Sequence, residues 1–304
     1  MKYKRLGAGD EWTRQSSDLA ETGPTRNSGR SANTWQPTRE SWRDRRFDSP
    51  TSTRSPERAI REVRDESDPN ELLLPELAAD DTQEFVHGSA RIALEVEPRF
   101  HKYIFVEKDP CRFSELERLK EEYGHLRDRI QLVNEDANPF LKSLCSKSGW
   151  DKRRAVLFLD PFGMQVPWDT IEAIAKTKAI DLWLLFPLGI AVNRLIRIDG
   201  KISESVRERL NQVFGTDDWY GAFYGTRSFR GLFGSEERTE KIVKIEEIGK
   251  YYVERLNKVF PGVAPNPLPL CNSRGNPLYL FCFAAANPVG AKIAVKIAQH
   301  ILGS

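Results

Sequence analysis

Between residues 102 and 187 the chain alternates short apolar runs with stretches in which apolar residues recur at helical spacing. The apolar runs predict strands, and the helically spaced stretches predict helices between them. The expected strands are residues 102–107, 130–134, 156–159 and 180–186. The expected helices are residues 89–96, 114–123, 140–145 and 168–176. This alternation is typical of a parallel sheet with helices on both faces.

Two of these elements carry further local signals. The run 156–159 shows no polar alternation, so we expect protein to cover both of its faces. Ser114 and Glu117, three residues apart, fit a capping box at the start of the helix 114–123.

Beyond residue 187 the pattern predicts more helices and a closing hairpin. The expected helices are residues 189–198, 203–214, 236–259 and 289–302. The stretch from about 215 to 235 is rich in aromatic residues and glycines, which indicates an irregular insertion or lid. Two apolar runs flank a Ser-Arg-Gly-Asn-Pro turn within residues 269–284 and predict a terminal hairpin. The whole predicts an α/β, Rossmann-like sheet over residues 86–304.

Residues 1–85 differ from the rest of the chain. They are crowded with Arg, Ser, Thr, Pro and Asp, and no period of 2 or 3.6 runs through them, apart from a possible short helix at 56–66 and an apolar patch at 72–77. Such a segment buries too little apolar surface to offset its ordering entropy, so we expect disorder. The alternative is an Arg-rich arm with interleaved aromatic rings that contacts nucleic acid, although acids nearly match bases there.

Composition and charge narrow the class of protein. The net charge of +2 is too small to indicate a nucleic-acid partner. No apolar stretch reaches the roughly 18 residues that would span a bilayer. The start of the chain lacks the apolar core of a signal peptide. The four cysteines are scattered and the four histidines have no metal-ligand spacing. We therefore expect a cytoplasmic protein with reduced thiols and without a metal.

Three expected strands each end at an acid: Glu107, Asp136 and Asp160. In a parallel sheet these ends lie at one edge, where open α/β sheets bind ligands. A carboxylate at Glu107 can accept two hydrogen bonds from the ribose hydroxyls of a nucleoside cofactor. Asp136, with the Ala137 backbone, can receive an adenine edge, and Asp160 can face the reacting group. The alternative is that all three are solvated turn residues.

Five blocks resemble the three-Cys-motif partner (TcmP) family, which is similar to the class I S-adenosylmethionine-dependent methyltransferases. They lie at 88–94, 105–110, 134–138, 158–163 and 193–194. The resemblance implies a seven-stranded methyltransferase sheet, an S-adenosylmethionine site and a partner protein with a three-cysteine motif encoded nearby. Glu107, Asp136 and Ala137 would then contact the cofactor.

The block Asp160-Pro161-Phe162 is also similar to a motif of amino methyltransferases that act on nucleic-acid bases. This similarity implies that Asp160 and a backbone carbonyl hold the target amino group and that Phe162 stacks on the base. Asn193 and Arg194 would be substrate contacts at the mouth of the next strand. The expected function is methyl transfer to an amino group of a nucleic acid or nucleotide.

The chain departs from this family at its cofactor loop. A Gly-rich loop is expected about 20 residues before the ribose acid, but residues 79–87 contain no glycine and follow no apolar strand. The pair Gly7 and Gly9 lies far too early and also lacks a preceding strand. The first strand is therefore absent or replaced, which puts cofactor binding in question. Alternatives are a catalytically inactive Rossmann-like module that binds the partner, and a non-functional product of a damaged gene.

We hypothesise that residues from about 6 to 85 come from a frame-shifted or replaced reading of an ancestral segment. The motive is the abrupt change of composition near residue 86 together with the missing loop. Translating the other two frames upstream of codon 86 tests the idea. It fails if neither frame encodes a strand followed by a Gly-rich loop.

Overall fold

The computed structural model describes residues 88–161, 163–231 and 234–303. The predictions for residues 1–85, with their disorder or Arg-rich arm, therefore lie outside the described residues. Phe162 lies outside them too. Within the described part the first element is a helix over residues 88–95, close to the predicted 89–96. No helix among the described residues is long and apolar enough to cross a membrane.

The described strands form a small parallel sheet, a larger mixed sheet and a separate hairpin. The small sheet pairs β1 (Tyr103–Val106) with β2 (Ile130–Val133). In the larger sheet the order is β3–β4–β9–β7, and β8 also pairs with β9. Its strands are β3 (Ala155–Leu159), β4 (Ile180–Phe186), β7 (Gly262–Val263), β8 (Leu268–Cys271) and β9 (Pro277–Ala285). Only the β3–β4 pair in it is parallel.

The sheet division corrects one prediction from the sequence. Among the described residues β3 pairs only with β4, so it is an edge strand. Val156 is 54% exposed and Phe158 is 37% exposed, whereas we expected both faces of this run to be covered. The apolar run identified a strand correctly, and the larger core covers the face that carries Leu157 and Leu159. In the described part, the opposite face, with Val156 and Phe158, is left largely exposed. The fold is α/β, with a mixed sheet that contains the parallel β3–β4 pair.

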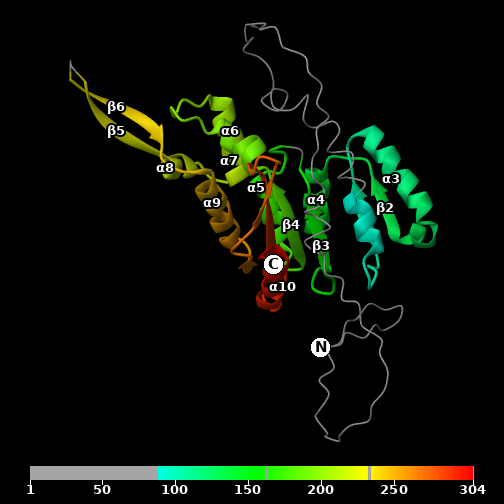
Figure 1. Ribbon diagram of the computed structural model, residues 1–304. Helices are drawn as coiled ribbons and strands as arrows, with labels where there is room; N and C mark the ends of the chain where they lie inside the picture. The colour runs from blue at the N-terminus through cyan, green and yellow to red at the C-terminus, as the bar shows by residue number, and fades with distance from the viewer. Residues whose placement is uncertain (1–87, 162, 232–233, 304) are drawn as a thin grey trace, which may run out of the picture.

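The helices divide between the two sheets (Figure 1). Helix 88–95, α3 (Pro110–Glu122) and the short 3-10 helix η1 (Gly124–Arg129) belong to the β1–β2 unit, where they share a buried cluster with both strands. One face of the larger sheet carries α5 (Trp168–Lys176), α7 (Glu204–Phe214) and α9 (Ile245–Asn257). The other face carries α10 (Ala291–Gly303), which packs on β7 and β9. Between the units runs α4 (Ala137–Ser146), whose Leu141 joins the larger core.

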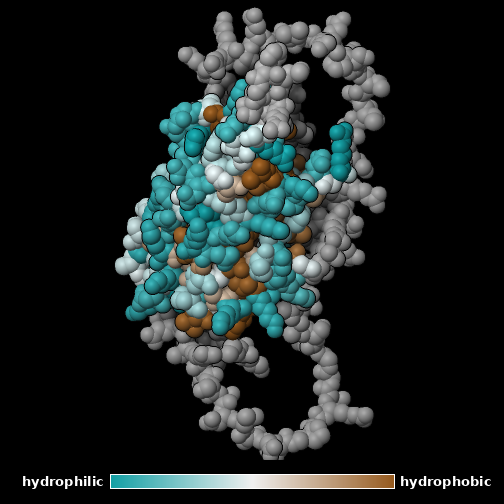
Figure 2. All heavy atoms as spheres, turned by 90° about the vertical axis from the view of Figure 1, so that its left-hand side faces the viewer, coloured by the Kyte–Doolittle hydropathy of each residue, from teal (hydrophilic) through white to brown (hydrophobic). Residues whose placement is uncertain are grey.

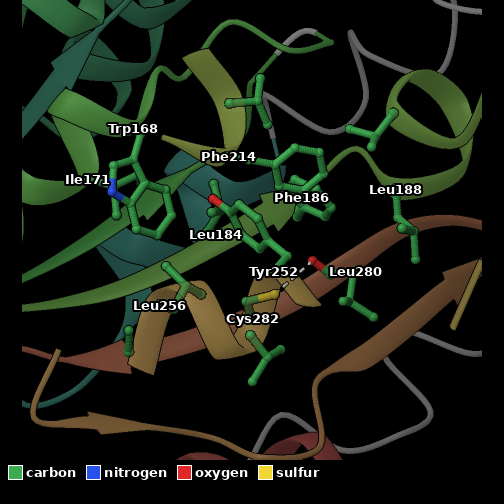
Figure 3. Packing of buried hydrophobic residues seen from close by; sticks show 14 of the residues in the cluster. Trp168, Ile171, Leu184, Phe186, Leu188, Phe214, Tyr252, Leu256, Leu280 and Cys282 are labelled. Carbon is green, nitrogen blue, oxygen red and sulfur yellow. Dashed lines mark hydrogen bonds between the residues drawn. The ribbon is translucent and has the colours of Figure 1, made fainter. Parts of the chain in front are cut away.

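The larger core is built around aromatic rings from three elements (Figure 3). The Tyr252 ring on α9 stacks on Phe186 at the end of β4, with ring centroids 3.7 Å apart. Phe214 at the end of α7 contacts both rings, and Cys282 of β9 lies beside them. Because β4 contributes side chains to this core along its whole length, it is the most buried strand.

The stretch predicted as an irregular lid is regular. Helix α8 (Trp219–Phe223) leads into an antiparallel hairpin of β5 (Tyr224–Gly231) and β6 (Gly234–Lys241), which projects from the body as an arm (Figure 1). Trp219 and Phe223 are fully buried at the base of this arm. The helix predicted over 236–259 is therefore wrong in its first third, and α9 begins only at Ile245. The face on the arm side is mostly hydrophilic, with small separate apolar patches (Figure 2).

Two predicted helices also differ in detail from the structure. Asp109 caps α3 by accepting a hydrogen bond of 2.9 Å from the Arg112 amide, and Pro110 occupies the first turn. Ser114 lies inside the helix and donates to the Pro110 carbonyl, so the predicted capping box is wrong. After β4 the chain forms a π-helix η2 (Leu188–Val192) and a single turn α6 (Asn193–Leu195) instead of one helix over 189–198.

Candidate functional site

Glu107 lies at the carboxyl end of β1 and is tied to β2. Its amide donates to the Val133 carbonyl at 3.0 Å, so the chain is still in register with β2 at this point. Its Oε1 accepts a hydrogen bond of 2.8 Å from the Asp109 amide, which fixes the carboxylate over the turn into α3. The Asn134 side chain donates to the carbonyl oxygens of Glu107 at 2.8 Å and of Lys108 at 3.2 Å. The half-buried carboxylate is therefore held in one place.

Asp136 follows β2 and caps the helix α4. Its Oδ1 accepts a hydrogen bond of 2.9 Å from the Asn138 amide, and its Oδ2 lies 3.8 Å from the Lys108 ammonium. Ala137 is the first residue of α4, where backbone amides have no partner within the helix. The site can thus offer a fixed carboxylate and a helix-start amide, although one carboxylate oxygen already serves the helix.

Asn138 has a structural role at this site that was not predicted from the sequence. Its Nδ2 donates to the Gln165 carbonyl at 2.8 Å, and its Oδ1 accepts a hydrogen bond of 3.2 Å from the Thr170 hydroxyl. Thr170 is fully buried at the start of α5. Asn138 therefore links the segment after β2 to the segment after β3. The signal in the sequence was an Asn two residues after a helix-capping Asp.

Asp160 follows β3, and its charge acts on Tyr279 of β9. Surrounding protein atoms desolvate the Asp160 carboxyl and raise its pKa to about 6, against an opposing effect of the Arg112 guanidinium. The side chain still has solvent access, so it is crowded without being sealed off. Desolvation, with the nearby Asp160 charge, raises the pKa of Tyr279 to about 12. Phe158 lies two residues before Asp160, and Phe281 lies two residues after Tyr279. The two phenyl rings meet edge to face, with their centroids 6.1 Å apart.

The chain turns sharply after Asp160. Pro161 is buried and Gly163 has a φ of +65°, a conformation that favours glycine. A recess beside Pro161 reaches Pro187 and Tyr252 and measures about 10 Å³. This volume holds about one water molecule. Phe162, the predicted stacking ring, lies outside the described residues.

Asn193 and Arg194 lie on α6, after the π-helix. The Asn193 Oδ1 accepts a hydrogen bond of 2.7 Å from the Lys241 ammonium at the base of the arm. Burial lowers the pKa of Lys241. Asn193 therefore anchors the arm, while Arg194 is exposed beside it.

The strand-end acids fall into two groups instead of lining one sheet edge. Glu107 and Asp136 belong to the β1–β2 unit, and Asp160 belongs to the larger sheet. Arg112 and Asn138 reach from the first unit toward the second and keep the groups near each other. A wider groove of about 520 Å³ lies elsewhere, between the start of α5 and the end of α7.

In the described part of the chain, no group of three or more His, Cys, Asp or Glu side chains is arranged so that it could hold a metal ion. All four cysteines are free thiols. No protein-family model matches the chain, and a search among curated proteins finds no match.

Proposed function

We propose that the chain is an S-adenosylmethionine-dependent methyltransferase-like protein that acts on an amino group of a nucleic acid or nucleotide. Asp160 carries the proposal. It lies at the carboxyl end of a parallel strand, where α/β sheets bind ligands, and its pKa of about 6 suits proton exchange near neutral pH. A carboxyl tuned toward neutrality by desolvation is typical of a functional site.

The chemistry of amino methylation fits this carboxyl. When a methyl group is added to an amino nitrogen, that nitrogen must lose a proton. Asp160 can accept a hydrogen bond from the amino group and then take the proton as a general base. The Pro161 carbonyl would hold the second amino hydrogen, and Phe162 would stack on the base. The proposed roles of Asn193 and Arg194 are weaker, because Asn193 is already bonded to Lys241.

The cofactor side fits only in part. Glu107 is a fixed carboxylate suited to a ribose diol, and Asp136 with the Ala137 amide offers an acceptor and a donor to an adenine edge. When bound, S-adenosylmethionine would supply the methyl group from its positively charged sulfonium sulfur. The described residues contain no Gly-rich loop for its amino-acid end, so the fit is to the nucleoside half. A three-Cys-motif partner protein is proposed on the family resemblance alone, and so are a Rossmann-like identity and a cytoplasmic location.

Calorimetric titration of the full chain with S-adenosylhomocysteine tests the proposal. We expect a dissociation constant in the micromolar range. Glu107→Ala should weaken binding roughly tenfold or more, since it removes a charge-assisted hydrogen bond. Glu121→Ala, an exposed acid on the outer part of α3, is the matched control and should bind as the parent does. The absence of binding heat for the parent chain would refute the cofactor half of the proposal.

A second candidate is an inactive partner-binding module. The observation that favours it is the division of the sheet between the β1–β2 unit and β3. A third hypothesis is that the chain is the non-functional product of a damaged gene. If the parent does not bind the cofactor product, but a chain rebuilt with a strand and a Gly-rich loop before residue 88 does, the damaged-gene reading is favoured. If neither binds, the inactive module remains.

A further inference from the structure

The edge of β3 that does not face β4 is open toward the β1–β2 unit. Among the described residues β1 pairs only with β2, and β3 pairs only with β4. Arg112 at the start of α3 acts electrostatically on Asp160, and Asn138 on α4 bonds the segment after β3. The two units therefore lie next to each other, with the open edge of β3 on the side of the smaller sheet (Figure 1).

Backbone groups of β3 point to this open edge. The Ala155 amide donates at 3.1 Å to the carbonyl of Ala179, the residue before β4. Successive amides of a strand point to opposite sides, so the amides of Val156 and Phe158 face away from β4. The carbonyls of these two residues point the same way. The edge thus presents two donors and two acceptors at the spacing of a sheet ladder.

The same alternation applies to β1. The Glu107 amide is directed at the Val133 carbonyl of β2, so the amides of Ile104 and Val106 are directed away from β2. Within residues 88–161 and 163–231, both parallel pairs therefore end at a strand whose outward backbone groups face no other strand.

On one face of the sheet, the side chains that flank the open edge are apolar. Val156 and Phe158 are the exposed large apolar residues of β3, at 54% and 37%. The buried clusters of the two units are separate, and the intervening helix α4 contributes the buried Leu141 to the larger one. An extended segment at this edge would pair its backbone with that of β3, and its own side chains on this face would lie beside Val156 and Phe158.

Charge gives the segment a direction. Lys102 precedes β1, and Arg153 and Arg154 precede β3, all of them exposed. At the other end Arg112 offsets the charge of Asp160. A segment that runs parallel to β3 places its amino end beside the three cations, so an acid at that end is favourable.

We propose that the open edge of β3 is a docking slot for an extended apolar segment of a partner protein, which adds to β3 as a parallel strand and carries an acid at its amino end. This is recognition by strand addition, in which main-chain hydrogen bonds give affinity and side-chain pockets give specificity. The proposal is independent of methyl transfer, because it concerns the sheet edge and not the strand-end acids.

Hydrogen exchange of the full chain tests the slot directly. The probe is a synthetic peptide with one glutamate followed by an uncharged run of valine and isoleucine that matches the 5 residues of β3. We expect the Val156 and Phe158 amides to exchange quickly in the free chain and at least about tenfold more slowly with the peptide, since they gain hydrogen bonds. The Ala155 and Leu157 amides, which face β4, should be protected in both states. Slow exchange of Val156 and Phe158 without peptide would overturn the proposal.

A matched pair of variants locates the contact. Val156→Asp should weaken peptide affinity about tenfold or more, because it puts a charge beside the apolar side chains of the added strand on that face. Ile293→Asp on α10 alters a residue of similar exposure, 58% against 54%, and should leave the affinity within about twofold. Equal losses from the two variants would indicate nonspecific apolar binding and refute the slot. A peptide N-methylated at alternate residues should not bind, and one with lysine in place of glutamate should bind more weakly. Undiminished binding of the N-methylated peptide would refute strand addition.

Discussion

Replacing Asp160 with Asn is expected to stabilise the protein at neutral pH but not at acid pH. Desolvation raises the pKa of Asp160 to about 6, whereas an aspartate in an unfolded chain has a pKa of about 3.9. The ionised carboxylate is thus less favourable in the folded state. The ionised carboxylate therefore lowers the free energy of unfolding. This effect is absent below about pH 4, grows between about pH 4 and pH 6, and reaches its full size above about pH 6.

The size of the effect follows from the pKa difference and the exposure of the side chain. In a fully buried group such a difference corresponds to about 3 kcal/mol. Asp160 retains solvent access, and solvent screening reduces this to about 1 kcal/mol. Asp160→Asn removes the charge, so its gain in free energy of unfolding should be about 1 kcal/mol larger at pH 8 than at pH 4.

Urea unfolding followed by tryptophan fluorescence measures this difference. Trp168 and Trp219 are buried in the larger core, so their signal follows the unit that carries Asp160. The same substitution at the exposed Asp217, between α7 and α8 of the same unit, gives the generic effect of removing one carboxylate there. If the gain from Asp160→Asn is equal at the two pH values, or larger at pH 4, the inferred desolvation of Asp160 is refuted.

Three further substitutions probe packing. Gly215→Ala should lower the free energy of unfolding by about 3 kcal/mol, because Gly215 has a φ of +68° and a Cβ there would lie 2.1 Å from the Trp168 ring; an unchanged melting temperature would contradict this contact. Asn138→Ala should cost about 2 kcal/mol in urea unfolding, since it removes the shorter of the two hydrogen bonds of the buried Thr170 hydroxyl and leaves only the one of 3.4 Å to Asp169; Thr170→Val in that background should recover part of the loss. Tyr252→Ala should cost about 4 kcal/mol by calorimetry, because it deletes a fully buried ring from the core; a loss under about 1 kcal/mol would mean that the ring is not packed as described.

Elements with a strong local pattern were predictable. The bounds of β4 and α5 agree with the prediction at both ends, because both combine dense apolar residues with clear breaks in the pattern. The hairpin of β5 and β6 was missed for the opposite reason. Its strands project from the body, so no buried face imposes an alternating pattern. Its Glu, Arg and Lys residues favour helix in isolation, and pairing across the hairpin overrides that preference.

Of the candidate site, only the residues at the ends of strands could be predicted from the sequence. Glu107, Asp136 and Asp160 follow directly from their positions after apolar runs. Arg112 and Tyr279 come from elements far apart in the chain, and their proximity to Asp160 depends on how those elements pack. The exposure of Val156 and Phe158 was also beyond the sequence pattern. An apolar run shows that a strand is suited to burial, but the presence of a covering neighbour is a tertiary property.

The separation of the buried clusters has a consequence for how the molecule loses its structure. Residues around β1 and β2 form one apolar cluster, and the larger sheet has two of its own, one on each face. Contacts within each unit are mutually dependent, whereas the link described between them rests largely on the hydrogen bonds of Asn138 and the packing of α4 on α5. The two units should therefore behave as distinct cooperative units, with the smaller one opening while the larger remains folded. A single melting temperature would then describe the larger unit and conceal the earlier transition of the smaller.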